Sequence, residues 1–353
     1  MSCSIHIIGS RICGGAERFY ARLVNSLAEQ SQVLAVNALN SPVSDLLDEA
    51  VEQRHPPMRN NYDLPGMLAI RKISSAAAPA IVQTYMGRAT RLTHLPRGKG
   101  LVHVARLGGY YNLKAYRHAH HLIGNTKGIC DYLIREGRPA ESVHYISNFV
   151  EPIPAPSADE RTALRESLGI PADAFVITCA ARFHPNKGLP DLLEAFSNVW
   201  KKHPQSRLIL VGDGPLANEI RKKIQTLEIE SAVILPGWCD PQPYYHLADI
   251  LTCPSRHEPL GNTILEAWAC GKPLVATATF GATELITPDQ NGIITPVQDP
   301  DALTDAFEKL IQDKALCEAL ANDGARTVKN RFSKRVITGQ YLSLYEQLLN
   351  NAR

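Results

Sequence analysis

The sequence has little of what would indicate a membrane span, a disulfide framework or a structural metal. No window of the 353 residues reaches the roughly 20 consecutive apolar residues that a membrane-spanning helix needs. The 8 cysteines are scattered and form no Cys-x-x-Cys pair, so we expect reduced, mostly buried thiols and a cytoplasmic protein. Apolar residues alternate at Ile5 and Ile7 before Arg11, which predicts a first strand rather than a signal peptide.

The chain also lacks the Gly-x-Gly-x-x-Gly fingerprint of dinucleotide-binding proteins and any large net charge. The loop after the predicted first strand carries Gly14 and Gly15 instead, which either let a ligand approach the backbone or simply make a strand–helix turn. A formal net charge of +2 gives no general attraction to polyanions, and we expect no nucleic-acid partner.

The length predicts two domains, and alternating strand and helix patterns predict an α/β fold in both. A Pro-rich segment at 149–156 is typical of a linker, so we place an N-terminal domain at 1–150 and a C-terminal domain at 151–335. The strands are expected at 4–9, 33–38, 81–84, 101–105, 121–124, 143–146, 175–180, 206–211, 233–235, 249–253 and 274–278. Long loops are expected at 60–66 and 85–100.

The most informative stretch runs from Pro254 to Ala276, where a polar loop separates a buried strand from a helix. Loops at the carboxyl ends of strands are where open α/β sheets bind ligands. Two carboxylates, Glu258 and Glu266, frame this loop, and Asn262 is expected to cap the helix. Between them lie the N–H groups of a helix N-terminus, which suit a phosphate: those of Leu260, Gly261, Asn262 and Thr263. Phosphates flanked by hydroxyls describe a sugar nucleotide.

The string Glu-Pro-Leu-Gly-Asn-Thr-Ile-Leu-Glu-Ala, followed by Gly-Lys-Pro, resembles the Glu-x7-Glu signature of the retaining glycosyltransferases of family four. The resemblance implies two Rossmann-like domains facing across a cleft, the GT-B architecture, with the last helix, 336–353, returning to the first domain. It implies that Glu258 meets the donor sugar hydroxyls and Glu266 the ribose hydroxyls. A short motif recurs by chance, so Glu-x7-Glu alone would describe an ordinary loop carboxylate and a solvated helix residue.

Further segments resemble the same family. Ala181-Arg-Phe-His-Pro-Asn-Lys-Gly matches a family segment that places Arg182 and Lys187 on the donor diphosphate; otherwise both are solvated surface cations. The family's nucleobase pocket is implied at Gly212 and Trp238, although Trp238 could equally pack in the core. The resemblance also implies donor contact at Gly15. Acceptor-side residues are expected at Gly14, Tyr85 and Arg106.

Two places depart from the family pattern or imitate another one. Gly108 stands where many relatives carry a histidine, and nearby His103 is expected to be a packed core residue. Asp299-Pro300-Asp301 matches the metal-binding Asp-x-Asp of another glycosyltransferase class, but it opens a helix and is expected to cap it. No cluster has metal-ligand spacing, so we expect no metal and no other cofactor.

The resulting prediction is a metal-independent retaining glycosyltransferase in which Glu258, Arg182 and Lys187 serve the transfer. The donor is a nucleotide diphosphate sugar, and the acceptor is a glycan or glycolipid of cell-surface polysaccharide or lipopolysaccharide synthesis. Two alternatives remain. One is another GT-B enzyme, such as a nucleotide-sugar epimerase or a phosphorylase. The other is a nucleotide-sugar binding protein with a dead site.

Basic residues are concentrated between Arg59 and Arg138, where only Asp63, Asp131 and Glu136 oppose them. The basic residues are Arg59, Arg71, Lys72, Arg88, Arg91, Arg97, Lys99, Arg106, Lys114, Arg117, Lys127, Arg135 and Arg138. Such a block is either a solvated face or a surface for an anionic partner. Apolar residues interleaved with the cations favour an anionic membrane, and hence a peripheral enzyme on the inner face of the plasma membrane.

Overall fold

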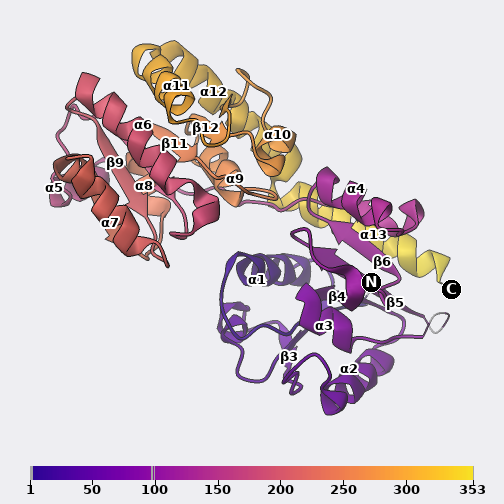
Figure 1. Cartoon of the computed structure of the whole chain (residues 1–353). Coiled ribbons are helices and arrows are strands. Elements are labelled where there is room, and N and C mark those ends of the chain that lie inside the picture. The colour runs from indigo at the N-terminus through magenta and orange to yellow at the C-terminus, as the bar shows by residue number, and fades with distance from the viewer. Residues whose placement is uncertain (1–2, 97, 99, 353) are drawn as a thin grey trace. The chain divides into compact units, whose positions relative to one another are not determined.

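The computed structural model describes residues 3–96, 98 and 100–352, and the chain forms two compact units (Figure 1). Unit 1 contains the described residues up to Asn148 and again from Lys334 onward, and unit 2 spans Phe149–Ser333. Each unit is a parallel sheet with helical connections, which is the α/β class that the sequence predicts.

Unit 1 is built on seven parallel strands in the order β3-β2-β1-β4-β5-β6-β7. The strands are β1 (Cys3–Ile8), β2 (Gln32–Asn37), β3 (Glu52–Arg54), β4 (Ala80–Tyr85), β5 (Leu101–Leu107), β6 (His121–Gly124) and β7 (Val143–Tyr145). The helices are α1 (Gly15–Ala28), α2 (Leu64–Ala76), α3 (Met86–Leu92), α4 (Lys127–Arg135) and, from the end of the chain, α13 (Lys334–Asn351). Strand β1 pairs with both β2 and β4, so the order in which successive strands are added to the sheet reverses at β1.

Three details of unit 1 differ from the sequence prediction. The stretch 85–100 is not one long loop, because α3 buries Ala89 and Leu92 against the core and so gains enough apolar contact to form. Helix α2 begins inside the other predicted loop, since the Asp63 carboxylate accepts from Gly66 N at 3.2 Å and caps it. The short edge strand β3 was not predicted, because its three residues carry too little apolar pattern.

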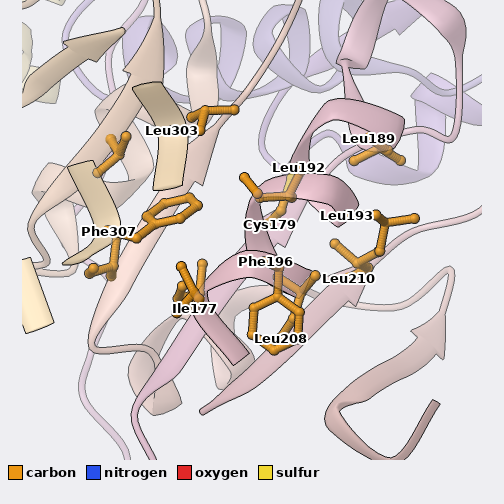
Figure 2. Close-up of a cluster of buried hydrophobic side chains, with 14 of the residues drawn as sticks. Ile177, Cys179, Leu189, Leu192, Leu193, Phe196, Leu208, Leu210, Leu303 and Phe307 are labelled. Carbon is orange, nitrogen blue, oxygen red and sulfur yellow. The ribbon is translucent and has the colours of Figure 1, made fainter. Parts of the chain in front are cut away.

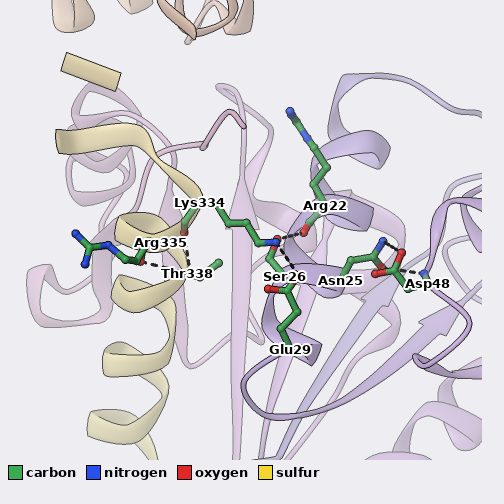
Figure 3. Close-up of polar contacts among 8 residues, drawn as sticks. All are labelled: Arg22, Asn25, Ser26, Glu29, Asp48, Lys334, Arg335 and Thr338. Carbon is green, nitrogen blue, oxygen red and sulfur yellow. Dashed lines mark hydrogen bonds and ion pairs between the residues drawn. The ribbon is translucent and has the colours of Figure 1, made fainter. Parts of the chain in front are cut away.

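The C-terminal helix α13 is held to unit 1 by buried polar side chains. Tyr345 donates to Gln83 Oε1 at 2.7 Å, and Arg106 Nε donates to the Tyr341 hydroxyl at 3.0 Å. At its exposed start, the Lys334 ammonium pairs with the Glu29 carboxylate at 2.6 Å (Figure 3). Buried hydrogen bonds of this kind position a helix more specifically than apolar contact does, because an unpaired partner would be costly.

Unit 2 is built on six parallel strands in the order β10-β9-β8-β11-β12-β13. The strands are β8 (Val176–Ala180), β9 (Arg207–Val211), β10 (Val233–Gly237), β11 (Ile250–Cys253), β12 (Leu274–Thr277) and β13 (Ile293–Thr295). The helices are α5 (Ala158–Ser167), α6 (Leu189–Lys202), α7 (Ala217–Thr226), α8 (Gln242–Leu247), α9 (Asn262–Ala269), α10 (Phe280–Leu285), α11 (Pro300–Gln312) and α12 (Lys314–Thr327). Asp299 Oδ1 accepts from Ala302 N at 2.9 Å and caps α11, which confirms the capping reading of Asp-x-Asp.

The strands of unit 2 bury apolar side chains on both faces of the sheet, as parallel sheets require. Ile177 and Cys179 of β8 pack with Phe196 of α6 and Phe307 of α11 (Figure 2). The alternate residue, Val176, belongs to a separate cluster that includes Leu247 of α8. This double burial explains why the unit's strands read as continuous apolar runs.

Two histidines are fully buried in unit 1 and are kept neutral. His6 accepts or donates at Tyr85 and Ser4, and His103 bonds the Thr84 hydroxyl at 3.0 Å. Burial lowers the pKa of His6, and burial together with neighbouring histidines lowers that of His103, each to about 3. His103 is therefore a packed core histidine, as the sequence predicts.

We expect unit 1 to lose stability as the pH falls from 7 to 5. The unfolded chain binds protons on both imidazoles below a pH of about 6.5, whereas the folded unit binds them only near its lowered pKa values. Each histidine adds up to about 1.4 kcal/mol per pH unit to the slope of the free energy of unfolding against pH. His103→Gln should reduce the slope by that amount, and the exposed His55→Gln should not. Hydrogen-exchange protection of β1, β4 and β5, corrected for intrinsic rates, measures it; equal slopes in all three proteins would contradict the expectation.

Candidate functional site

The candidate site of unit 2 lies where the strand order of its sheet reverses. Strands β8 and β11 are neighbours in the sheet, and the connections that follow them contain Lys187 and Glu258 respectively. At such a switch point two adjacent loops leave the carboxyl edge of the sheet in opposite directions, which opens a crevice for a ligand. The sheet order therefore brings together two residues that are 71 positions apart in sequence.

The two loops at this point are locked to each other by backbone and side-chain contacts. The carbonyl oxygen of Asn186 accepts from Arg256 N at 2.8 Å and from His257 N at 3.2 Å. The Arg256 guanidinium forks onto the Asp191 carboxylate with contacts of 2.8 and 2.6 Å. Gly188 sits at φ 62°, and a Cβ there would lie only 1.9 Å from the Pro254 carbonyl oxygen. The loops are thus held in contact along their length.

Lys187 and Glu258 form an ion pair between these loops, and both side chains are mostly buried. Burial lowers the pKa of the Lys187 ammonium, but the Glu258 carboxylate beside it raises the pKa more, and the net direction is up. Lys187 therefore stays charged at neutral pH, and the pair holds one positive and one negative group at the sheet edge.

Further positive charge lies in the same connection as Lys187 and at the start of the helix that follows Glu258. Arg182, directly after β8, is exposed and makes no ion pair with any residue that the structure describes. Helix α9 begins at Asn262 with Gly261 as its N-cap, at φ 86°, and no side chain caps it. The prediction that Asn262 caps the helix is therefore wrong: Gly261 adopts the left-handed conformation and starts the helix one residue earlier. An uncapped helix N-terminus leaves N–H donors for a ligand.

Glu266 lies in α9 and is partly exposed, and a buried tyrosine holds it. The Tyr245 hydroxyl of α8 donates to Glu266 Oε2 at 2.8 Å. Burial, together with the Glu266 carboxylate, raises the pKa of Tyr245 well above its usual value. The hydroxyl therefore remains a donor and Glu266 remains an acceptor.

The predicted nucleobase residues lie at the same edge of the sheet. Gly212 follows β9 and donates to the Gly237 carbonyl at 2.9 Å, and a Cβ on Gly212 would lie 1.9 Å from the Ala181 carbonyl oxygen. Trp238 follows β10 with 66% of its surface exposed. Trp238 is therefore not a core residue, and its ring is available to stack on a flat ligand.

In unit 1, Gly14 and Gly15 lie at the N-terminus of α1, at the carboxyl edge of the sheet. Gly14 N donates to the Glu17 carboxylate at 3.0 Å, and Arg88 Nη1 donates to the Gly9 carbonyl at 2.9 Å, so the loop is pinned at both ends. Gly108 follows β5 at the same edge, and a Cβ there would meet Asn125 Nδ2 at an ordinary 3.6 Å.

Two predicted acceptor-side residues are not available to a ligand in this structure. Tyr85 is buried, and its hydroxyl bonds His6 Nδ1 at 2.8 Å and Gln83 Nε2 at 2.6 Å. Arg106 is buried against the Phe19 ring, 4.0 Å from its centroid, and binds Tyr341 and Asn148. Both belong to the hydrogen-bonded network that holds α13, so the structure shows a structural role for each.

Part of the basic block between Arg59 and Arg138 is used inside unit 1 and is not free for a partner. Arg88, Arg106 and Arg138 are used internally, the last donating to the Ala119 carbonyl at 2.7 Å, and Arg97 and Lys99 lie outside the described residues. Exposed apolar side chains do accompany part of the block: Tyr62, Leu64 and Leu68 are 75%, 61% and 59% exposed. Arg91 lies 4.5 Å above the Tyr62 ring.

Across residues 3–96, 98 and 100–352, no group of three or more His, Cys, Asp or Glu side chains is arranged to hold a metal ion. In the same part of the chain, every helix is too short or too polar to cross a bilayer.

Two units, each a parallel sheet with helical connections, are the components of the GT-B fold. Alr3699/HepE of Anabaena, in complex with UDP and glucose, has this fold at a TM-score of 0.85, with 21% identity over 98% of this chain and 100% of that one. The prediction of two parallel-sheet α/β domains with the GT-B fold is therefore confirmed.

The family follows from sequence similarity. The family described as "Glycosyl transferases group 1" matches residues 160–327, all within unit 2. The lipopolysaccharide core biosynthesis glycosyltransferase LpsE of Rhizobium meliloti (strain 1021) is 32% identical over 94% of this chain and 95% of its own length. LpsD of the same organism, with the same description, is 29% identical over 95% of both chains. The chain therefore belongs to the group 1 glycosyl transferase family, which confirms the resemblance.

Sequence reasoning missed the residues that support the site. Asp191 and Arg256 pair across 65 positions, and Tyr245 reaches Glu266 across 21. Each reads as an ordinary helix or loop residue, and no local pattern marks its partner. What the three residues share in the sequence is a polar group near apolar residues, and this signal is too weak to identify a partner.

A pair of glycine substitutions tests the contact between the two loops. Gly188 and Gly271 share φ 62°, but a Cβ has open space at Gly271 and a clash at Gly188. Gly271→Ala should therefore destabilise unit 2 by about 1–2 kcal/mol, the ordinary left-handed penalty. Gly188→Ala should cost about 1–3 kcal/mol more, because the Pro254 carbonyl must move. Denaturant unfolding, followed by tryptophan fluorescence, measures both changes in the free energy of unfolding. Equal changes for the two variants would mean that the Pro254 carbonyl moves away at no cost.

Proposed function

We propose that the protein transfers a sugar from a nucleotide diphosphate sugar to a glycan or glycolipid acceptor, with retention at the anomeric carbon. The observation that carries the proposal is the Lys187–Glu258 pair beside the uncapped start of α9 and the unpaired Arg182. Positive groups of this kind suit a diphosphate, and a carboxylate among them suits sugar hydroxyls. The UDP bound to the similarly folded HepE supports a nucleoside diphosphate donor.

In the proposed reaction, the donor replaces the contact between Lys187 and Glu258 with contacts of its own. Lys187 and Arg182 turn to the diphosphate and stabilise the charge that grows on it as the glycosidic bond breaks. Glu258 orients the sugar through its hydroxyls, Glu266 binds the ribose, and Trp238 stacks on the base. These cations and the α9 N-terminus supply the positive charge that a leaving diphosphate needs, so we propose that no metal is required.

Retention is proposed to follow a front-face route. The leaving diphosphate oxygen accepts the proton of the acceptor hydroxyl as that hydroxyl bonds to the anomeric carbon from the face the leaving group vacates. Glu258 pairs with Lys187 and is assigned to orientation rather than to nucleophilic attack. The acceptor is assigned to unit 1, next to Gly14 and Gly15.

The lipopolysaccharide core relatives, which match nearly the whole chain, support a lipopolysaccharide-type acceptor. We therefore place the protein in the cytoplasm, on the inner face of the plasma membrane.

A ligand panel and two variants test the proposal. Uridine, guanosine or adenosine diphosphate should raise the melting temperature, since a ligand that binds only the folded state stabilises it. Lys187→Ala should lower turnover of the matching nucleotide sugar by 10-fold or more, by about 1.5–3 kcal/mol of lost charge-assisted contact. Lys201→Ala, at the exposed end of α6, is the control.

No stabilisation by any of the three diphosphates would refute the donor site. Conversion of the donor's sugar into another sugar without an acceptor would indicate an epimerase. A requirement for inorganic phosphate would indicate a phosphorylase. Binding of the nucleotide sugar without turnover would indicate a dead site. Inverted product would refute retention. Loss of activity in chelator, restored by magnesium or manganese, would refute metal independence.

For the membrane, we propose that the face formed by Tyr62, Leu64, Leu68, Arg71 and Lys72 meets anionic lipid. The apolar residues at the start of α2 are exposed, and the two cations follow on the same helix. Apolar groups that enter the lipid boundary beside cations that face its headgroups are typical of peripheral attachment. Each cation contributes about 1 kcal/mol near such a surface.

Vesicle sedimentation tests this face. Leu64→Ser with Leu68→Ser, and separately Arg71→Glu with Lys72→Glu, should each reduce binding to anionic vesicles at least 10-fold, because each removes one of the two attractions. Leu39→Ser with Leu46→Ser, two exposed leucines outside the basic block, is the matched control. Raised salt should weaken wild-type binding. Equal, negligible binding to anionic and neutral vesicles would instead favour a soluble acceptor.

A further inference from the structure

We propose that Tyr245 is a positioning residue for Glu266, and that through Glu266 it makes the site select a ribose over a deoxyribose. The inference rests on the proposed function, in which Glu266 meets the ribose hydroxyls. Tyr245 itself touches no ligand in this scheme, because it is 1% exposed.

The geometry divides the Glu266 carboxylate into two differently used oxygens. Oε2 accepts the Tyr245 hydroxyl at 2.8 Å, and among the described residues no side chain or backbone group bonds Oε1. A glutamate on a helix surface rotates freely about its last torsion, which has broad preferences. One fixed oxygen removes that freedom and leaves the other to accept from a ligand hydroxyl.

The direction of the hydrogen bond also matters for recognition. The Tyr245 hydroxyl can act here only as the donor while Glu266 is ionised, and burial together with that carboxylate keeps the phenol protonated by raising its pKa. Glu266 therefore presents acceptors only. A ribose offers two neighbouring hydroxyl donors, and a deoxyribose lacks one of them.

Tyr245 can position Glu266 only if its own helix is fixed, and α8 is held at its C-terminal end. The ammonium of Lys272 donates to the carbonyl oxygens of His246 at 3.1 Å and Ala248 at 2.6 Å. Lys272 lies between α9, which carries Glu266, and β12. The same segment of chain therefore fixes both partners of the tyrosine–glutamate contact, and the Tyr245 ring packs in the apolar cluster of Leu251 and Ile264.

The hydroxyl can be removed without disturbing this packing. Tyr245→Phe keeps the ring and its apolar contacts and deletes only the donor to Glu266. Tyr244→Phe, at the neighbouring and partly exposed position of α8, is the matched control, because its hydroxyl does not reach Glu266 in the described structure.

The test is calorimetric titration of the whole protein with the nucleoside diphosphate that stabilises it most and with its 2′-deoxy and 3′-deoxy forms. We expect wild type to bind the ribose form about 10-fold more tightly than at least one deoxy form, as one charge-assisted hydrogen bond allows. Tyr245→Phe should lose most of this preference by weakening only the ribose form, and Tyr244→Phe should keep it. Glu266→Gln should lose the preference too, and adding Tyr245→Phe to it should change little further. In turnover, Tyr245→Phe should raise the KM for the donor and leave kcat unchanged.

The possible failures are distinct. Equal weakening of ribose and deoxyribose forms by Tyr245→Phe would mean that the hydroxyl supports the fold and not recognition, and it would overturn the inference. Unchanged affinities would overturn it as well. Wild type that binds the diphosphates without preferring the ribose would overturn this inference and leave the donor site standing. Wild type that binds none of them would overturn the proposed function and this inference with it.

Discussion

The Asn186 carbonyl accepts two backbone hydrogen bonds from the loop after β11, and the geometry of the candidate site depends on this contact. It joins two loops that belong to different βα connections and meet only because β8 and β11 are neighbours in the sheet. Gly188 allows the approach, since any side chain would collide with the Pro254 carbonyl. The Arg256–Asp191 fork then fixes the register of the loops, and a planar bidentate pair tolerates little displacement. Lys187 and Glu258 are placed by backbone that cannot easily move, which is how a site keeps its groups ready for a ligand.

The two charges of the candidate site are each other's ion-pair partners, so any ligand that separated them would have to supply a new partner for each. Lys187 and Glu258 neutralise each other in a mostly buried position, where an isolated charge would be costly. A ligand that brings both an anion and hydroxyls can replace each partner at once, whereas a simple anion would leave Glu258 unpaired. By this argument the proposed sugar-nucleotide donor suits the pair better than inorganic phosphate does. Arg182, unpaired and exposed, adds net attraction without needing to be released.

The candidate site could be predicted from sequence where its residues belong to one local segment. Glu258, Glu266 and the start of α9 lie within a single strand–loop–helix pattern, so their placement follows from the motif. The error at Asn262 was one residue, because a glycine in the left-handed conformation and an asparagine both suit the start of a helix. In unit 1 the structure shows Tyr85 and Arg106 buried and hydrogen-bonded inside the unit. Both are polar residues at the carboxyl end of a strand, where binding residues often lie, and only the fold shows that Arg106 meets Tyr341 of α13 from the far end of the chain.

The sequence by itself determined the α/β class, the position of most strands, the helix cap at Asp299 or Asp301 and the core position of His103. These are local properties, since hydrophobic periodicity, turn residues and caps act over a few positions of the backbone. Only the tertiary structure decided that Lys187 meets Glu258, that Arg256 forks onto Asp191, and that Tyr245 holds Glu266. Those pairs depend on which strands are neighbours and on the direction in which each loop leaves the sheet. No single segment contains that information, because it arises when strands far apart in the chain share their backbone hydrogen bonds.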